Sequence, residues 1–224
     1  VLQAYLPDSH LVQQELTAWA KARVAAGGAP IKLRIVKGAN MEMEQIESAF
    51  YNWPLAPYDN KLEVDANYKR MVAYGMQPEN IRSVHLGIAS HNLFELAYGL
   101  VLAWERNALD RIQFEMVEGM ANHQRRALTE LAGDVLLYAP ATRREHFINA
   151  IGYLVRRLDE NTGADNFLGH AFRLEPDSPE WERLAGQFLA ESILTVLFCS
   201  VLAIMLVEAV LPYFNQLIGR EATW

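Results

Sequence analysis

The segment Ile-Lys-Leu-Arg-Ile-Val-Lys-Gly-Ala-Asn (31–40) is a short apolar run that alternates with basic residues and ends in glycine. A run of this kind, bounded by turn residues, predicts a β-strand over Lys32–Val36. Similar runs predict further strands, which are Val1–Tyr5, Ser83–Ile88, Ile112–Met116 and Val135–Tyr138, with a weaker extended piece near Leu62–Val64. The chain is therefore rich in short, apolar strands.

Helical periodicity fills the intervals between these strands, over residues 9–26, 41–50, 66–75, 92–106, 121–131 and 143–160. Alternation of strands and helices predicts an α/β fold with parallel strands and crossover helices. The order suits either a (β/α) barrel or an open, doubly wound sheet. The chain contains no Gly-x-Gly-x-x-Gly motif and no phosphate loop, so nothing in it favours a Rossmann cofactor site.

Local motifs predict several boundaries. Thr142-Arg-Arg-Glu145 has the pattern of a capping box, which predicts a helix from residue 143. Ser178-Pro179 predicts a helix start, and Trp53–Tyr58, with two prolines, predicts a loop. The segment Asn161–Asp177 is rich in Gly, Asn and Asp, which predicts a poorly ordered connection.

Composition limits the classes of function. The chain has 224 residues and a net charge of −7, which argues against nonspecific nucleic-acid binding. The single cysteine, Cys199, excludes an internal disulfide framework and a cysteine-rich metal site. The chain begins with Val1 in a strand-like segment, without an initiating Met, so we expect it to be a piece that starts inside a domain.

An abrupt change in composition marks the end of the chain. Residues 193–214 read ILTVLFCSVLAIMLVEAVLPYF, an apolar run whose one charged residue is Glu208. The run is long enough to cross a bilayer, so it predicts a transmembrane helix. The alternative is a buried core helix, which rarely stays apolar on every side for this length.

The pattern of residues 143–160 places two kinds of side chain on opposite faces. One face is apolar and carries Phe147, Ile148, Ile151, Leu154, Val155 and Leu158. The other carries Tyr153, Arg156, Arg157 and Glu160 at helical spacing. This second face is either an ordinary solvated face or a carboxylate-binding face, because each guanidinium offers a planar fork of donors.

Two strand ends carry further candidate residues. Arg34, Lys37 and Gly38 lie at the end of a parallel strand, where ligands bind in such folds, although an exposed strand end is the alternative. His91 and Glu95 have the i, i+4 spacing of metal ligands, but no third ligand is close in sequence. Glu115 and Glu118 form a carboxylate pair that could do acid–base work.

Three segments, residues 31–40, 89–92 and 153–161, resemble the proline dehydrogenase domain of bifunctional flavoproteins of the proline utilization A family. The resemblance runs from about Val1 to about Arg183. It implies the later part of a (β/α)8 TIM-type barrel, about strands 4–8. It also implies FAD as cofactor and oxidation of L-proline to 1-pyrroline-5-carboxylate, with hydride passing to the flavin.

The resemblance also implies roles for individual residues. Substrate binding and catalysis would fall to Arg156, Arg157, Tyr138 and Tyr153, and Val117 would line the proline pocket. Flavin contacts would come from Gln3, Arg34, Val36, Lys37, Gly38, His91 and Asn92. The implied partners are a membrane quinone as electron acceptor and an aldehyde dehydrogenase domain; nucleic acid is not among them, and no metal is implied.

The chain departs from this family at both ends. A lysine and an aspartate that the family draws from earlier strands have no counterpart, so we expect the chain alone to oxidise proline poorly. The tail resembles a helix of an FtsX/MacB-like ABC-transporter permease, which suggests a chimeric reading frame.

We accordingly expect a partial barrel (1–160), a connecting segment (161–186) and an apolar helix (187–224). The helix would contact membrane lipid and place the chain on the cytoplasmic side of a membrane. The alternative function is a membrane-anchored or permease-derived interaction protein with a vestigial α/β domain.

Overall fold

A computed structural model describes residues 1–38, 40–162, 166–171, 173–193 and 205 of the chain. Its centre is a five-stranded parallel sheet in which the strands pair in chain order. The strands are β1 (Leu2–Gln3), β2 (Ile31–Val36), β3 (Val84–Ala89), β4 (Ile112–Val117) and β5 (Val135–Tyr138). Each lies where its apolar run predicts it, with ends shifted by a residue or two.

The strand order decides between the two architectures that the sequence left open. A doubly wound sheet reverses its order at a switch point. Here the order is β1-β2-β3-β4-β5 without a reversal, and every pair is parallel. Sequential parallel strands with right-handed crossovers wind in one direction, as in a (β/α) barrel. The fold is thus α/β and consistent with part of a barrel.

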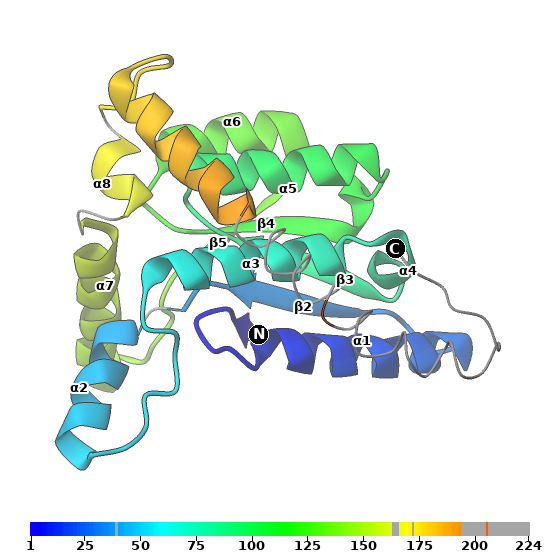
Figure 1. The fold of residues 1–224 in the computed structure, drawn as a ribbon, viewed down its shortest axis with the longest axis horizontal. Coiled ribbons are helices and arrows are strands. Elements are labelled where there is room, and N and C mark those ends of the chain that lie inside the picture. Colours follow the sequence, from blue (N-terminus) through cyan, green and yellow to red (C-terminus); the bar gives the residue numbers. More distant parts are fainter. Residues whose placement is uncertain (39, 163–165, 172, 194–204, 206–224) are drawn as a thin grey trace.

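Helices follow the strands as the periodicity predicts. They are α1 (Ser9–Ala25), α2 (Met41–Tyr51), α3 (Lys61–Gly75), α4 (Pro78–Ile81), α5 (Leu93–Glu105), α6 (Asn122–Ala132), α7 (Phe147–Thr162) and α8 (Phe167–Ala171), with short 3₁₀ turns η1 (Leu109–Arg111) and η2 (Arg144–His146) and a further helix over 179–193. Figure 1 shows α1, α3, α5 and α6 arranged along the sheet, with α2 and α7 together at one end of the molecule.

The two faces of the sheet differ in character. Alternate side chains on β2 to β4 are buried against the helix layer: Leu33, Ile35, Leu86, Ile88, Phe114 and Met116. Helices α3 and α5 supply the facing core residues, among them Tyr68, Met71 and Leu100. Burial of such side chains stabilises the fold by about 1.5–3 kcal/mol each. The opposite face, which we call the inner face, carries Arg34 and Glu115 by the same alternation.

Helix α3 begins earlier than its apolar periodicity predicts. The extended piece expected near Leu62–Val64 is wrong, because these residues form the first turn of α3. Asn60 is the cause, since its side-chain oxygen accepts a hydrogen bond from the backbone N–H of Glu63 at 3.0 Å. This bond satisfies one of the free donors at the helix start and fixes the boundary.

Replacing Asn60 by alanine is expected to lower the free energy of unfolding by about 1 kcal/mol, because it removes this cap. Urea denaturation followed by circular dichroism measures the loss. The matched control is Asp59→Ala, since Asp59 is exposed and lies one residue before the cap. Equal losses in both variants would show that the cap does not set the stability of α3.

Among the other local predictions, some are confirmed and others are wrong. The start at Ser178 is confirmed, because its hydroxyl accepts from the N–H of Trp181 at 3.1 Å. The loop at 53–58 is confirmed as well. The capping box is wrong: η2 begins at Arg144, α7 begins only at Phe147, and Thr142 makes no cap. Part of the connection expected over 161–177 is helical, since it contains α8.

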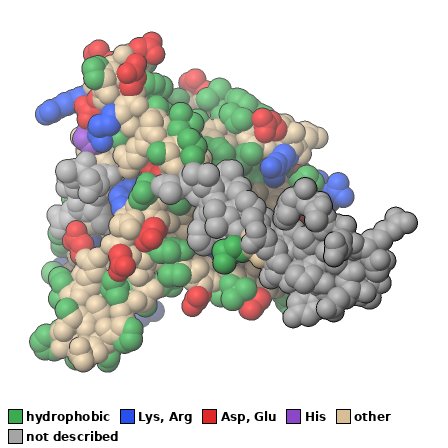
Figure 2. All heavy atoms as spheres, viewed as in Figure 1, with side chains coloured by type: hydrophobic (Ala, Val, Ile, Leu, Met, Phe, Trp, Pro, Cys, Tyr) green, Lys and Arg blue, Asp and Glu red, His purple; other side chains and the backbone are tan. Residues whose placement is uncertain are grey.

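Helix α7 has its apolar face largely in solvent. Phe147 is 60% exposed and Ile148 is 73% exposed, although both belong to the stripe that periodicity marks as a packing face. Phe50 on α2 is 80% exposed at the same end of the molecule. Figure 2 shows hydrophobic side chains on the surface at the lower left, where α2 lies in Figure 1.

The expected membrane localisation requires a correction. A search of the described residues finds no helix with the length and apolar character needed to cross a bilayer. The apolar run 193–214, and with it the permease resemblance and the expected lipid contact, lies outside the described residues except for Ile193 and Met205.

Candidate functional site

The carboxyl ends of the five strands meet at one edge of the sheet, because all strands run parallel. Most residues that the sequence singled out lie at this edge. They fall into three groups: one on the inner face, one on the rim toward the helices, and one on α7.

The inner group contains neighbours in the sheet register. Gln3 on β1 pairs with Val36 on β2, and Val117 on β4 pairs with Tyr138 on β5. The alternation that buries Ile35 against the helices turns Val36 toward the inner face. The structure therefore brings the expected proline-pocket residues Val117 and Tyr138 side by side.

Arg34 on β2 contacts residues of both β4 and β5 in the inner group. Its Nε donates to the carboxylate of Glu115 on β4, and its guanidinium lies over the Tyr138 ring, 4.0 Å from the ring centre. Lys32 is a second cation beside Glu115, at 3.3 Å. Between these strands lies Gly87, where a side chain would overlap the Glu115 carboxylate. A glycine at this position is what lets residues of β2 reach β4 across β3.

The Arg34–Tyr138 contact spans three strand spacings. Neighbouring strands lie about 4.8 Å apart, so the backbones of β2 and β5 would be about 14 Å apart on a flat sheet. Both side chains are long, and the Arg34 guanidinium reaches to 4.0 Å from the centre of the Tyr138 ring. The contact therefore joins β2 and β5 across the inner face.

The rim group centres on Lys37, which follows β2 and turns toward the helix layer. Its ammonium lies 2.5 Å from Asp65 Oδ1 on α3 and 2.6 Å from Glu95 Oε1 on α5. Burial alone would lower the pKa of Lys37, but Glu95 and Asp65 outweigh it and raise the pKa well above its usual value. Burial likewise opposes ionisation of Asp65, yet Lys37 and Lys61 lower its pKa. Lys37 is therefore a firmly protonated cation that forms ion pairs with two carboxylates.

The other rim residues have structural partners of their own. His91 Nε2 accepts from the N–H of Val117 at 3.0 Å, and burial lowers the pKa of His91, so the ring is neutral. Asn92 caps α5, because its Oδ1 accepts from the N–H of Phe94 at 3.0 Å. Gly38 has a φ of +113°, and the ring of Tyr5 occupies the space where a side chain would lie.

The third group lies on α7. The guanidinium of Arg157 lies over the Tyr153 ring at 5.0 Å, while Arg156 is exposed. The ring of Tyr138 instead meets Arg34 on the inner face. Figure 1 shows α7 at the end of the molecule where β2 leads into α2, which is the carboxyl end of the sheet.

Beside the rim lies a small cleft of about 20 Å³ between α3, α5, α8 and helix 179–193, whose walls include Lys61, Asn92 and Phe188. Lys69 on α3 holds helix 179–193 beside this cleft. The Lys69 ammonium lies 2.5 Å from Glu191 Oε2 and donates to the Phe188 carbonyl at 2.5 Å. The same ammonium lies 3.6 Å from the centre of the Phe188 ring. Lys69 and Glu191 are both buried.

Several of these partners were missed from sequence. Asp65, Glu95 and Glu191 are buried carboxylates that pair with lysines far away along the chain. Asp65 lies on the helix face that is otherwise buried, and a charge on such a face is a signal of a paired group. The sequence predicts Glu115 as one of a carboxylate pair with Glu118, whereas its ion pairs with Lys32 and Arg34 were missed. Among the described residues, no group of three His, Cys, Asp or Glu side chains could hold a metal ion.

Comparisons with known proteins are consistent with this arrangement. A family profile described as proline dehydrogenase matches residues 1–170. A search of curated proteins finds no match.

Among solved structures, proline utilization A from Corynebacterium freiburgense is 42% identical, with a TM-score of 0.72; the match covers 87% of this chain and 18% of that one. The protein from Bdellovibrio bacteriovorus, inactivated by N-propargylglycine, is 36% identical, with a TM-score of 0.68 and coverage of 76% and 17%. A Bradyrhizobium japonicum variant, at 23% identity and a TM-score of 0.62, shares the fold. The chain thus spans less than a fifth of each of these proteins.

Proposed function

The chain belongs to the proline dehydrogenase family, and from this premise we propose that it takes part in the FAD-dependent oxidation of L-proline to 1-pyrroline-5-carboxylate. The observation that carries the proposal is the Arg34–Glu115–Tyr138 arrangement on the inner face. It places an expected flavin-contacting cation beside an expected substrate-pocket tyrosine. The family match and the identity of 42% to a proline utilization A support the same reaction.

The residues at the strand ends fit an FAD group by their chemistry. Arg34 and Lys37 are cations, and the Gln3 amide offers both donor and acceptor. A bound flavin would supply the hydride acceptor that no side chain can provide. Arg34 would favour negative charge on the reduced ring, and His91 and Asn92, near the start of α5, would lie on the phosphate and ribose side.

The substrate would be held by side chains of opposite character. We propose that Arg156 and Arg157 bind the proline carboxylate, since guanidinium groups match the geometry of a carboxylate. Val117 and Tyr138, adjacent in the sheet, would form the apolar wall of the pocket, and Tyr153 would border it from α7. A quinone is the proposed electron acceptor, and an aldehyde dehydrogenase domain the proposed partner for the product.

The proposal predicts that the purified chain retains FAD after free FAD is removed, and that L-proline slowly bleaches the retained flavin without oxygen. An absorbance spectrum measures both steps. We expect Arg34→Met to lower flavin retention at least tenfold, whereas Arg82→Met, at an exposed position far from the site, leaves it unchanged.

Two outcomes would contradict separate parts of the proposal. If no flavin is retained by the wild-type chain, the cofactor assignment to this chain is wrong. If flavin is retained but L-proline and D-proline bleach it equally slowly, the substrate assignment is wrong. N-propargylglycine, with which the Bdellovibrio relative was inactivated, serves as an additional probe, and we expect it to block bleaching by L-proline.

A further inference from the structure

Lys37 lies in a cluster of charged and polar side chains that contact with a flavin alone does not explain. Each of its two carboxylate partners has a second polar neighbour: Asp65 Oδ2 lies 2.5 Å from Lys61, and Glu95 Oε2 accepts from the Ser90 hydroxyl at 2.6 Å. Four charged groups thus share one site, and both carboxylates are buried. Charges are rarely buried unless each is paired, so this set is a closed unit.

The backbone holds this unit in place. Two adjacent residues of α3 tie the helix to the strand ends: Asn67 donates to the Ala4 carbonyl at 2.9 Å, and the Tyr68 hydroxyl donates to the Ala89 carbonyl at 3.1 Å. Asp65 lies less than one turn before them on the same helix. Glu95 lies in the first turn of α5, beside the Asn92 cap. Both carboxylates therefore project from anchored backbone, which favours one position for the Lys37 ammonium.

The charges in this unit cancel. Lys37 and Lys61 contribute two positive charges, and Asp65 and Glu95 contribute two negative charges. The Lys37 ammonium lies between the two carboxylates, and its side chain remains 22% exposed, so part of it can meet a ligand. A ligand at the strand ends would therefore meet a fixed donor at Lys37 without a net charge. Arg34 differs, because it shares one carboxylate with Lys32.

We propose that Asp65 and Glu95 are positioning residues that fix the Lys37 ammonium at the cofactor side of the strand ends and cancel its charge. The inference rests on the proposed function, because it takes flavin as the group that Lys37 meets. It assigns the two cations different duties: Lys37 supplies a fixed hydrogen-bond donor, and the Arg34 group supplies the positive charge that favours the reduced flavin.

The first test needs no flavin. Lysines acylate through the neutral amine, so a clamped ammonium reacts slowly. In the native 224-residue chain, treated with an acetylating ester and digested for mass spectrometry, we expect Lys37 to react at least about tenfold more slowly than Lys21, which lies half-exposed on α1. In Glu95→Gln, Lys37 should react severalfold faster than in wild type. Equal rates for Lys37 and Lys21 in the wild-type chain would overturn the clamp.

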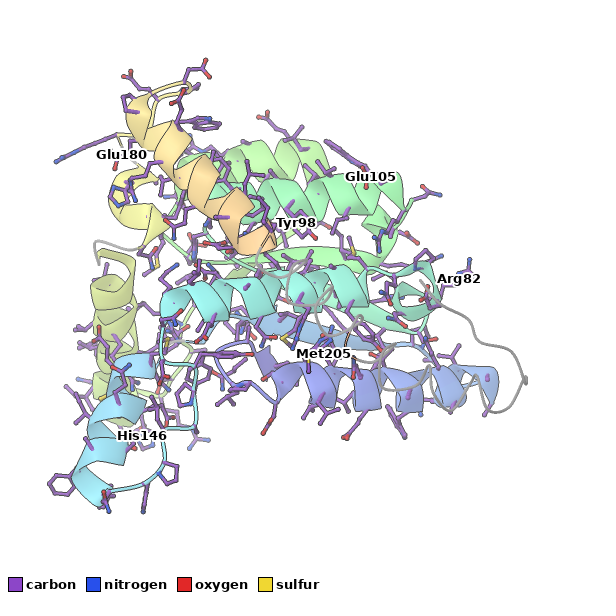
Figure 3. The ribbon with its side chains drawn as sticks, in the orientation of Figure 1. Arg82, Tyr98, Glu105, His146, Glu180 and Met205 are labelled. Carbon is purple, nitrogen blue, oxygen red and sulfur yellow. The ribbon has the colours of Figure 1, made fainter. Side chains whose placement is uncertain are left out.

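The second test measures the flavin midpoint potential of the FAD-loaded chain. Glu95→Gln keeps the size of the side chain and one acceptor oxygen, but it leaves one positive charge at Lys37 uncompensated. We therefore expect an upward shift of the potential, since the added charge favours the anionic reduced ring. The matched control is Glu105→Gln, the same substitution on the same helix at its exposed far end, which should not shift it (Figure 3).

The outcomes separate the two proposals. A chain that retains no flavin contradicts the proposed function, while the acylation rates still decide whether Asp65 and Glu95 hold Lys37. A flavin potential that is the same in Glu95→Gln and Glu105→Gln overturns the charge cancellation. A role in stability alone would lower the unfolding free energy of Glu95→Gln without moving the potential of its folded form. The flavin midpoint potential therefore distinguishes a role of Glu95 in positioning Lys37 from a role in stability alone.

Discussion

The Lys69→Met variant is expected to lose about 3–5 kcal/mol of the free energy that docks helix 179–193 onto α3. The reason is that Glu191, which is 3% exposed, would keep a buried charge without its ion-pair partner. The Phe188 carbonyl would also lose its donor. Hydrogen exchange of residues 179–193, together with urea denaturation, measures the loss.

Replacing both charges together should behave differently. The double variant Lys69→Met/Glu191→Leu removes the buried charges, and buried pairs replaced by apolar residues of similar size are often as stable as the original. We therefore expect it to recover most of the loss. Lys21→Met serves as the control, because Lys21 is half-exposed on α1. A single variant as stable as the double variant would show that the pair does not hold the helix.

The Arg157→Met variant is expected to raise the KM for proline by about 30-fold or more, in a closed-barrel protein that carries this chain. The loss of one partner from a desolvated, charged contact costs about 2–5 kcal/mol, which corresponds to that change. Arg157 lies over the Tyr153 ring, so it is already oriented, whereas Arg156 is exposed. We accordingly expect the smaller effect in Arg156→Met.

Steady-state proline oxidation and the flavin spectrum measure this prediction together. Flavin content should stay close to wild type in both variants, because the arginines are proposed to bind substrate. Arg143→Met is the matched control, since Arg143 is exposed just before η2. An unchanged KM in both arginine variants would show that α7 does not hold the carboxylate.

The sheet could be predicted from sequence because each strand is a local pattern. Apolar alternation in residues such as Leu33 and Ile35 determines which face meets the helices, and this pattern is readable within six residues. Val117 and Tyr138 came from the family resemblance, and their pairing in the sheet register is seen only in the structure. Helix limits were harder, because the start of α3 depends on one side-chain bond from Asn60.

The charged partners could not be predicted in the same way. Lys37 pairs with Asp65 and Glu95 only because three separate elements converge, and no periodicity encodes that meeting. The Lys69–Glu191 pair joins residues even further apart in the chain. For α7 the reverse holds: periodicity marks Ile148 as a packing residue, yet it is 73% exposed, because amphipathicity shows which face can pack and not what covers it.

The unbroken strand order has a consequence for how such a sheet can grow. Each inner strand pairs with the strand before it and the strand after it in the chain, so only one helical connection separates any two paired strands in sequence. A further unit could join beside β1 or β5 without breaking any existing pair. In a doubly wound sheet, by contrast, the first strand lies inside the sheet, so a unit that precedes it in the chain cannot simply pair beside it. This topology is therefore modular at its two ends: units can be added or lost there while the remaining strands keep their register.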